Sequence, residues 1–422
     1  MTAARALDPK NFALGERLPE TVHAPDNVDA LAALVRDCNA RQRAIVFFGG
    51  GTLQGLGHAP ERYDVAIRLG RIDRVLEYDH RDLTIAVEAG CTLAALQRTL
   101  AAHGQFLPLD APRSSQATVG GTLASGWLGP RRTAYGSARD FVIGTSVVLA
   151  DGSVAKAGGM VVKNVTGYDL SKLYIGSLGT LGALVRANFK TLPLPQTRRL
   201  AYAPLPEGTR ARAVKHLAGL SIEPAAALAV SGFSKEIDGS DGADGRVIVL
   251  LEGSQRLVES ATRELRSALG SAGVPETRLA DNDVEVAFER IVDAYVSSLG
   301  ARSATYRSGG LPTGATPRLD AFVRLSHSCK LKLETIEDLR SGDVIARLST
   351  AIARDLEERL VSFDGERRTV LAEARVVAAP QLLRGRLDAW GALPASLPTM
   401  RALKARFDPN FTLAPGRYVG RI

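Results

Sequence analysis

The stretch from Pro112 to Gly182 constrains the fold more than any other, because glycine is concentrated there in two blocks. The blocks carry Gly120, Gly121, Gly126, Gly129 and Gly136, and then Gly158, Gly159, Gly167, Gly176, Gly179 and Gly182. Glycine is favoured where the backbone approaches a ligand or takes a positive φ. Small hydroxyl side chains lie in the first block, at Ser114, Ser115, Thr118, Thr122 and Ser125. Such turns suit a pyrophosphate and a polyol chain. A loop-rich β domain is the weaker alternative, because a third block lies upstream.

That upstream block, GGGTLQGLG, follows an apolar segment, 44–48, that is predicted to be a strand. A dinucleotide fold of the Rossmann type requires a helix directly after its glycines. Here a second strand-like segment, 65–69, comes next, so this context excludes that fold. A glycine loop between two strands can still present N–H groups to a pyrophosphate.

The net charge of +8 and the pI of about 9.5 favour anionic partners, such as a phosphate-bearing cofactor or an acidic substrate. No long Lys/Arg run is interleaved with aromatic residues, so nucleic-acid binding is not expected. Cys38, Cys91 and Cys329 are far apart and form no CxxC. We therefore expect no iron–sulfur cluster, no structural zinc and a reducing compartment.

The N-terminal segment lacks the apolar core of a signal peptide, and no apolar run approaches about 18 residues. We expect a cytoplasmic protein. Peripheral association with the inner face of the membrane, through a partner, stays an open alternative.

Hydrophobic periodicity and turn signals predict the elements along the chain. Helices are expected at 25–40, 92–102, 210–220, 256–269, 284–299 and 343–361, with a short basic one in the tail. Strands are expected at 44–48, 65–69, 74–78, 83–88, 183–192, 200–203, 226–233, 246–252, 303–307, 318–325 and 369–378. The proline pair Pro193 and Pro195 marks a domain boundary.

With these blocks in hand, the first half resembles the FAD-binding module of the vanillyl-alcohol oxidase/PCMH family, and within it the E subunits of bacterial glycolate oxidases. The resembling blocks are FFGGGTLQGLG, ATVGGTLASGWLGPRRTAYGSARDFVIG, VVKNVTGYDLSKLYIGSLGTLG and LKARFDPNFTLAPGR. The resemblance implies an α+β fold: a two-subdomain FAD-binding module at 1–195 (about 20–90 and 91–195), an α+β cap with an antiparallel sheet at 196–398, and a tail at 399–422 that returns to the module.

The resemblance also implies the residues that hold FAD. The pyrophosphate loop comprises Gly49, Gly50, Gly51, Thr52, Gln54 and Gly55. The flavin and ribityl chain would be lined by Ser114, Thr118, Gly120, Gly121, Ser125 and Gly126, with Arg131, Arg139 and Asp140 at the flanks. The far side of the cofactor would be contacted by Lys163, Asn164, Gly167, Tyr168, Asp169 and, from the tail, Arg417.

Some of these residues have a plainer interpretation. Arg131 and Arg132 could neutralise a phosphate or attract a carboxylate, or could be a solvated pair on a loop. Tyr168 could be a packed aromatic, and Asp169 a helix cap.

Departures from the family pattern shape the expected chemistry. Covalent relatives carry His or Cys in the glycine loop, whereas this loop has neither, so FAD should be bound non-covalently, with His58 at the surface. Leu178 stands where the catalytic D subunit has a glutamate, and Ala414 where relatives often have Asn. The cap holds only His216 and His327, so no metal centre is expected.

The resemblance implies the FAD-binding subunit of a complex that oxidises glycolate, or another small 2-hydroxy acid. Its partners would be a sister flavin subunit and an iron–sulfur subunit that receives the electrons. One alternative is a self-sufficient FAD-dependent alcohol or hydroxy-acid oxidoreductase, with His327, Tyr306 or Arg324 as the base. Another is a scaffold that no longer binds flavin.

Overall fold

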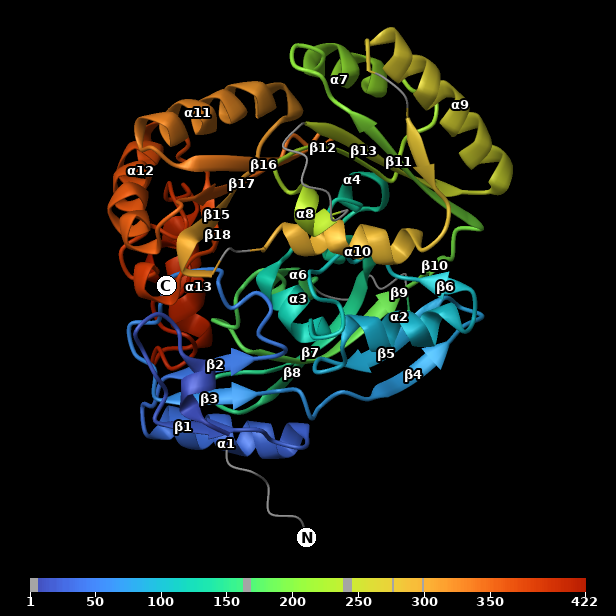
Figure 1. Ribbon diagram of the computed structural model, residues 1–422. Helices are drawn as coiled ribbons and strands as arrows, with labels where there is room; N and C mark the ends of the chain where they lie inside the picture. Colours follow the sequence, from blue (N-terminus) through green and yellow to red (C-terminus); the bar gives the residue numbers. More distant parts are fainter. Residues whose placement is uncertain (1–6, 162–167, 238–244, 275–276, 298–299) are drawn as a thin grey trace.

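Figure 1 shows the computed structural model, in which an N-terminal module packs beneath a cap that carries the large sheet. The structure describes residues 7–161, 168–237, 245–274, 277–297 and 300–422.

The first part of the N-terminal module is a three-stranded parallel sheet with the order β1-β3-β2 and one long helix. Its elements are β1 (Thr21–His23), α1 (Val28–Ala40), β2 (Ile45–Phe48) and β3 (Val65–Arg68). Asn27 caps α1, since its side chain accepts a hydrogen bond from Ala30 N at 2.9 Å. Turns and no helix connect β2 to β3, which confirms that this is not a Rossmann unit.

The second part is a five-stranded antiparallel sheet with the order β4-β5-β9-β7-β8. Its strands are β4 (Val75–Asp79), β5 (Thr84–Glu88), β7 (Val142–Val148), β8 (Val154–Gly158) and β9 (Ala183–Lys190). Its helices are α2 (Leu93–Ala101), α3 (Val119–Ser125), α4 (Arg132–Tyr135), α5 (Ala138–Phe141) and α6 (Ser171–Tyr174). The short strands β6 (Gln105–Phe106) and β10 (Leu192–Pro193) pair with each other.

The cap is built on an eight-stranded antiparallel sheet with the order β14-β11-β13-β12-β16-β17-β15-β18. Its strands are β11 (Thr197–Pro204), β12 (Ala226–Ser231), β13 (Arg246–Gly253), β14 (Arg278–Ala280), β15 (Ser303–Ser308), β16 (Lys332–Asp338), β17 (Val344–Ser349) and β18 (Arg375–Ala378). Its helices are α7 (Arg210–Ala218), α8 (Ser234–Ile237), α9 (Gln255–Ser271), α10 (Val284–Ala294), α11 (Ala315–Ser328) and α12 (Leu356–Val370).

The helices of the cap divide between the two faces of its sheet. Figure 1 shows α7, α9, α11 and α12 on the outer face and α10 between the sheet and the N-terminal module. One hydrophobic cluster runs from the module into the inner face of the cap and includes Leu123 of α3, Phe288 of α10 and Ile248 of β13. Because burial of apolar surface is the main stabilising term, this shared core holds the cap against the module.

Three sequence predictions in the cap were wrong. Residues 318–325 belong to helix α11, because Phe322 and Leu325 are buried at the three-residue spacing of a helix. The helix predicted from 343 begins only at Leu356 in α12, since 344–349 form the fully buried strand β17. The strand predicted from 369 begins at Arg375, and the strand β16 was missed.

The C-terminal tail returns to the N-terminal module through helix α13 (Leu397–Phe407) and a buried ion pair. Lys404 Nζ lies 2.6 Å from Asp408 Oδ2, and both side chains are fully buried. The same ammonium donates to Thr180 O at 2.9 Å and Leu413 O at 2.7 Å. The tail then runs beside β2, where Ala414 N donates to Ile45 O at 2.7 Å.

We predict that Asp408→Ala lowers the free energy of unfolding by about 3 kcal/mol or more, because it leaves the buried Lys404 ammonium unpaired. Urea denaturation measures the difference. Asp37→Ala is the control, since the Arg41–Asp37 pair is exposed and its loss should cost at most about 1 kcal/mol. Equal losses in the two variants would show that the buried pair does not anchor the tail.

Candidate functional site

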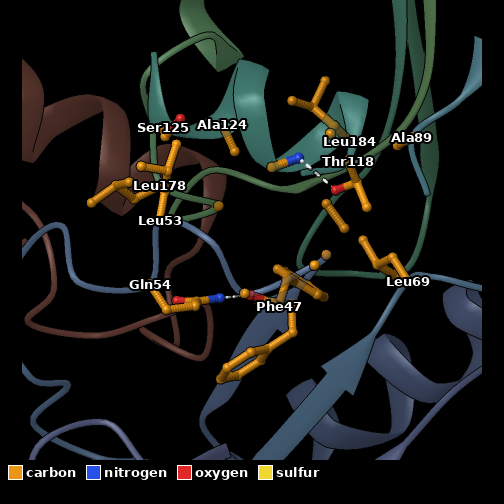
Figure 2. Close-up of a pocket in the computed structure, with 18 of the residues that line it drawn as sticks. Phe47, Leu53, Gln54, Leu69, Ala89, Thr118, Ala124, Ser125, Leu178 and Leu184 are labelled. Carbon is orange, nitrogen blue, oxygen red and sulfur yellow. Dashed lines mark hydrogen bonds between the residues drawn. The ribbon is translucent and has the colours of Figure 1, made fainter. Parts of the chain in front are cut away.

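Three turns of small residues, remote in sequence, meet around one cavity (Figure 2). The cavity holds about 730 Å³, open solvent at its mouth included. It is lined by Phe47, Phe48, Gly49, Gly50, Gly51, Thr52, Leu53, Gln54, Leu69, Ala89, Thr118, Gly120, Gly121, Ala124, Ser125, Leu178, Gly179, Gly182, Ala183, Leu184 and Arg417.

The glycines at the wall of the cavity are required by close backbone packing. A Cβ on Gly49 would lie 2.0 Å from Thr118 Oγ1, and one on Gly50 would lie 1.8 Å from Gln116 O. A Cβ on Gly120 would lie 2.8 Å from the Cβ of Ala89. No side chain fits at these distances, so the glycine loop lies directly against the turn that begins α3.

The glycine loop offers hydrogen-bond donors to the cavity. Within the part of the chain that the structure describes, the amides of residues 50–53 donate no hydrogen bond. The loop is closed by Gln54 Nε2, which donates to Phe47 O at 2.9 Å, and Thr118 Oγ1 accepts from Gly121 N at 3.2 Å (Figure 2). Free backbone donors on a fixed loop are the arrangement that a pyrophosphate requires.

A buried arginine from the tail completes the wall. Arg417 is 3% exposed and donates to Leu56 O at 2.9 Å. Within the described residues it has no carboxylate partner. Burial, together with neighbouring Arg384, lowers the pKa of Arg417 to about 10. A buried cation without a counter-ion favours an anionic occupant of the cavity.

The structure brings about half of the predicted FAD-binding residues together at this cavity. They are Gly49, Gly50, Gly51, Thr52, Gln54, Thr118, Gly120, Gly121, Ser125 and Arg417. Gly126, Arg139 and Asp140 line a neighbouring cleft instead. Gly55 packs against Val377 O, and Ser114 Oγ donates to Glu289 at 2.8 Å. Lys163, Asn164 and Gly167 lie outside the described residues.

Arg131 is not at the cavity, because three carboxylates bind its guanidinium. It pairs with Asp110 at 2.9 Å, Glu252 at 2.8 Å and Glu285 at 3.0 Å. Arg198 shares the last two carboxylates. This cluster joins the N-terminal module to the cap, so Arg131 is not a free ligand for a phosphate or a substrate.

Three further interpretations of single residues were wrong. Tyr168 is 94% exposed, not packed. Asp169 does not cap α6 but pairs with Lys172 at 3.1 Å. His58 is not on the surface: it is 7% exposed, and its Nε2 lies 4.0 Å from Asp388 Oδ1.

The three bases proposed for a self-sufficient enzyme all lie away from the cavity. Arg324 and His327 are exposed on helix α11, at the outer face of the cap. Tyr306 is fully buried in the cap core, and burial raises the pKa of its hydroxyl.

Sequence reasoning did not assign the third turn, 178–184, or Ala89 to the site. A signal was present, since Gly179 and Gly182 stand in the second glycine block. Leu178 adopts a φ of 52°, which β-carbon-bearing residues rarely adopt, and its amide donates to Ala124 O at 2.8 Å. Ala89 gave no signal, because only the fold brings it beside Gly120.

Comparison with known proteins identifies the group to which this site belongs. The sequence pattern of a family described as "FAD binding domain" matches residues 19–169. The glycolate oxidase subunit GlcE of Escherichia coli is 33% identical over 59% of this chain and 67% of its own length. The chain belongs to the PCMH-type FAD-binding family, close to the glycolate oxidase subunits.

Other members of the family extend the similarity. The glycolate oxidase subunit GlcD of Bacillus subtilis is 28% identical over 95% of this chain and 89% of its own length. A D-2-hydroxyglutarate dehydrogenase of Xanthomonas citri is 31% identical over 44% of this chain and 40% of its own length. The solved structure of p-cresol methylhydroxylase with substrate bound has the same fold, with a TM-score of 0.73 at 17% identity, over 96% of this chain and 89% of that one.

These similarities confirm the predicted α+β fold, the family and FAD as the cofactor. The residues at the cavity fit FAD, because free amides and a buried cation face the space that the phosphates need. Among the described residues that line the cavity there is no His, Cys or Tyr, and non-covalent binding stays a prediction.

The described residues contain no group of three or more His, Cys, Asp and Glu side chains placed to hold a metal ion. No helix among them is long and apolar enough to cross a bilayer.

We predict that Gly50→Ala raises the dissociation constant of FAD by about tenfold or more, because the added methyl group overlaps Gln116 O and displaces the loop. Quenching of flavin fluorescence measures the binding. The control is Gly385→Ala, where nothing lies within 4 Å of the added carbon. Unchanged affinity in Gly50→Ala would contradict the assignment of this loop to FAD.

We also predict a pH dependence of stability from His58. Burial, together with neighbouring Arg421, lowers its pKa from 6.5 to about 4. Between these values the unfolded chain takes up a proton and the folded chain does not, so the folded state loses up to about 3 kcal/mol as the pH falls from 6.5 to 4.

His58→Asn should therefore lose less stability across this range than the unmodified protein, as measured by urea denaturation at each pH. Exposed His23→Asn is the control and should follow the unmodified protein. If the free energy of unfolding falls by the same amount in His58→Asn as in the control, His58 is not the source of the pH dependence.

Proposed function

We propose that this chain is the FAD-binding subunit of a complex that oxidises glycolate or another small 2-hydroxy acid and passes the electrons to an iron–sulfur partner subunit. A sister flavin subunit completes the complex. The observation that carries the proposal is the cavity where free loop amides and buried Arg417 meet, in a chain similar to both GlcE and GlcD.

The residues of this chain would perform binding and orientation. The amides of residues 50–53 would hold the pyrophosphate, and Arg417, which binds the carbonyls of Gln54 and Leu56, would offset its charge. Leu53, Leu178 and Leu184 would exclude water from the apolar part of the cavity. FAD, once bound, supplies the two-electron chemistry that oxidation of a hydroxy acid needs.

The cysteines support a partner for onward electron transfer. Cys38, Cys91 and Cys329 are buried in three different hydrophobic clusters, so they do not converge on one site. A cluster held by four thiolates would therefore have to come from another chain. Arg324, His327 and Tyr306 do not line the cavity, so none of them can act there as the base. This favours a role as an electron relay over turnover by this chain alone.

The experiment compares the purified chain, loaded with FAD, with the complex reconstituted from all subunits. We expect FAD to bind and to be released on denaturation. Glycolate should reduce an artificial electron acceptor in the complex and not with this chain alone. Full turnover by the isolated chain would contradict the relay role, and failure to take up FAD would contradict the function altogether.

A further inference from the structure

A second cleft begins where the FAD cavity ends. We call it the arginine cleft. It consists of two adjoining hollows of about 1050 Å³ and 1120 Å³, open solvent included, which share Leu128, Arg132, Arg375, Trp390 and Tyr418. The first hollow also shares Ser125, the last residue of α3, with the FAD cavity. The two sites are therefore adjacent, at the junction of the N-terminal module, the cap and the tail.

Positive charge in the arginine cleft is only partly compensated. Asp343 accepts from Arg307 Nε at 3.1 Å and pairs with Arg132 at 2.9 Å. The side chain of Arg375, on β18, makes no hydrogen bond or ion pair among the described residues. Two guanidinium groups thus share Asp343, and the third, that of Arg375, has no carboxylate partner among the described residues.

The other acidic groups at the cleft do not compensate Arg375. Glu373 is exposed and accepts from Ser308 Oγ at 2.6 Å, and Asp140 accepts from the amide and hydroxyl of Ser137 at 2.7 and 2.9 Å. Burial, followed by neighbouring Arg307, lowers the pKa of Arg375 to about 10. The guanidinium stays charged at neutral pH, in surroundings that disfavour an unpaired charge.

Buried donors without acceptors line the same cleft. Within the described part of the chain, Arg132 Nε, Thr133 Oγ1 and Trp127 Nε1 are buried and have no hydrogen-bond partner. Each unsatisfied donor of this kind destabilises the folded chain, so such groups normally have a partner. Several orphaned donors beside an unpaired cation indicate a missing ligand that is anionic and rich in oxygen atoms.

We propose that Arg375, with Arg132 beside it, binds the carboxylate of the small 2-hydroxy acid or of its 2-oxo product in the arginine cleft. The proposal rests on the function proposed above and assigns its acid-binding residues. A guanidinium forms two parallel N–H···O bonds with a carboxylate, which fixes the orientation of the acid as well as its charge. Neutral alcohols lack this partner and are disfavoured.

The test is titration calorimetry of the chain with glycolate, oxalate and the neutral analogue glycolamide, with and without bound FAD. The unmodified chain should bind both acids and not glycolamide. Arg375→Gln should weaken acid binding by about tenfold or more. Arg375→Lys keeps the charge but not the paired donors, so its affinity for the acids should lie between that of the unmodified chain and that of Arg375→Gln. Arg354→Gln is the matched control, because Arg354 is 84% exposed and remote from the cleft in the cap.

Thermal unfolding gives a second readout that separates ligand binding from folding. Without acid, Arg375→Gln should unfold no earlier than the unmodified chain, because it removes an unpaired charge. Oxalate should raise the unfolding temperature of the unmodified chain and of Arg354→Gln, and not that of Arg375→Gln.

Equal oxalate affinity in Arg375→Gln and the unmodified chain would overturn the proposal. So would equal binding of glycolamide and glycolate, or no acid binding by the FAD-loaded chain. Acid binding without FAD uptake would support the arginine cleft and contradict the proposed flavin function, so the two failures are distinguishable.

Discussion

The close contact between the glycine loop and the turn at Thr118 is the constraint on which the rest of the site depends. At Gly49 and Gly50 the backbone lies where a Cβ would overlap Thr118 Oγ1 and Gln116 O. This contact brings the end of β2, a strand of the parallel sheet, against the start of α3, a helix of the part of the module that contains the antiparallel sheet. The amides of residues 50–53, which line the cavity, donate no hydrogen bond within the described residues, and such free donors suit a diphosphate.

The remaining wall is supplied from the other end of the chain. Lys404 binds Thr180 O, so the tail holds the third turn of the cavity in place through a buried ammonium. Trp390 Nε1 donates to Arg417 O at 3.1 Å, which ties the arginine of the cavity to the region that follows β18. Because Trp390 also lines the arginine cleft, its hydrogen bond to Arg417 connects the two sites.

The sequence was informative where function requires a particular backbone. Gly49, Thr118 and Gly120 could be assigned to the expected FAD site, because closely packed turns need glycine and small side chains whatever the rest of the fold does. The cap was harder, because the neighbours that bury residues 318–325 and 344–349 decide whether each segment is a helix or a strand.

Residues whose role depends on a distant partner could not be recognised from sequence. Nothing in the sequence distinguishes Arg131 from Arg375, yet among the described residues the fold gives the first three carboxylate partners and the second none. His58 was expected at the surface, and only the return of the tail across it explains its burial. Tertiary context, and not local pattern, sets the electrostatic role of such groups.

Hydrogen–deuterium exchange during titration with FAD tests the central claim most directly, namely that the three turns form one cradle. The account predicts that exchange slows together in peptides covering 49–55, 117–126 and 177–184, with the same FAD concentration at half-effect, while helix α9 on the outer face of the cap is unchanged. Slowing in only one of the three peptides, or at different FAD concentrations, would contradict it.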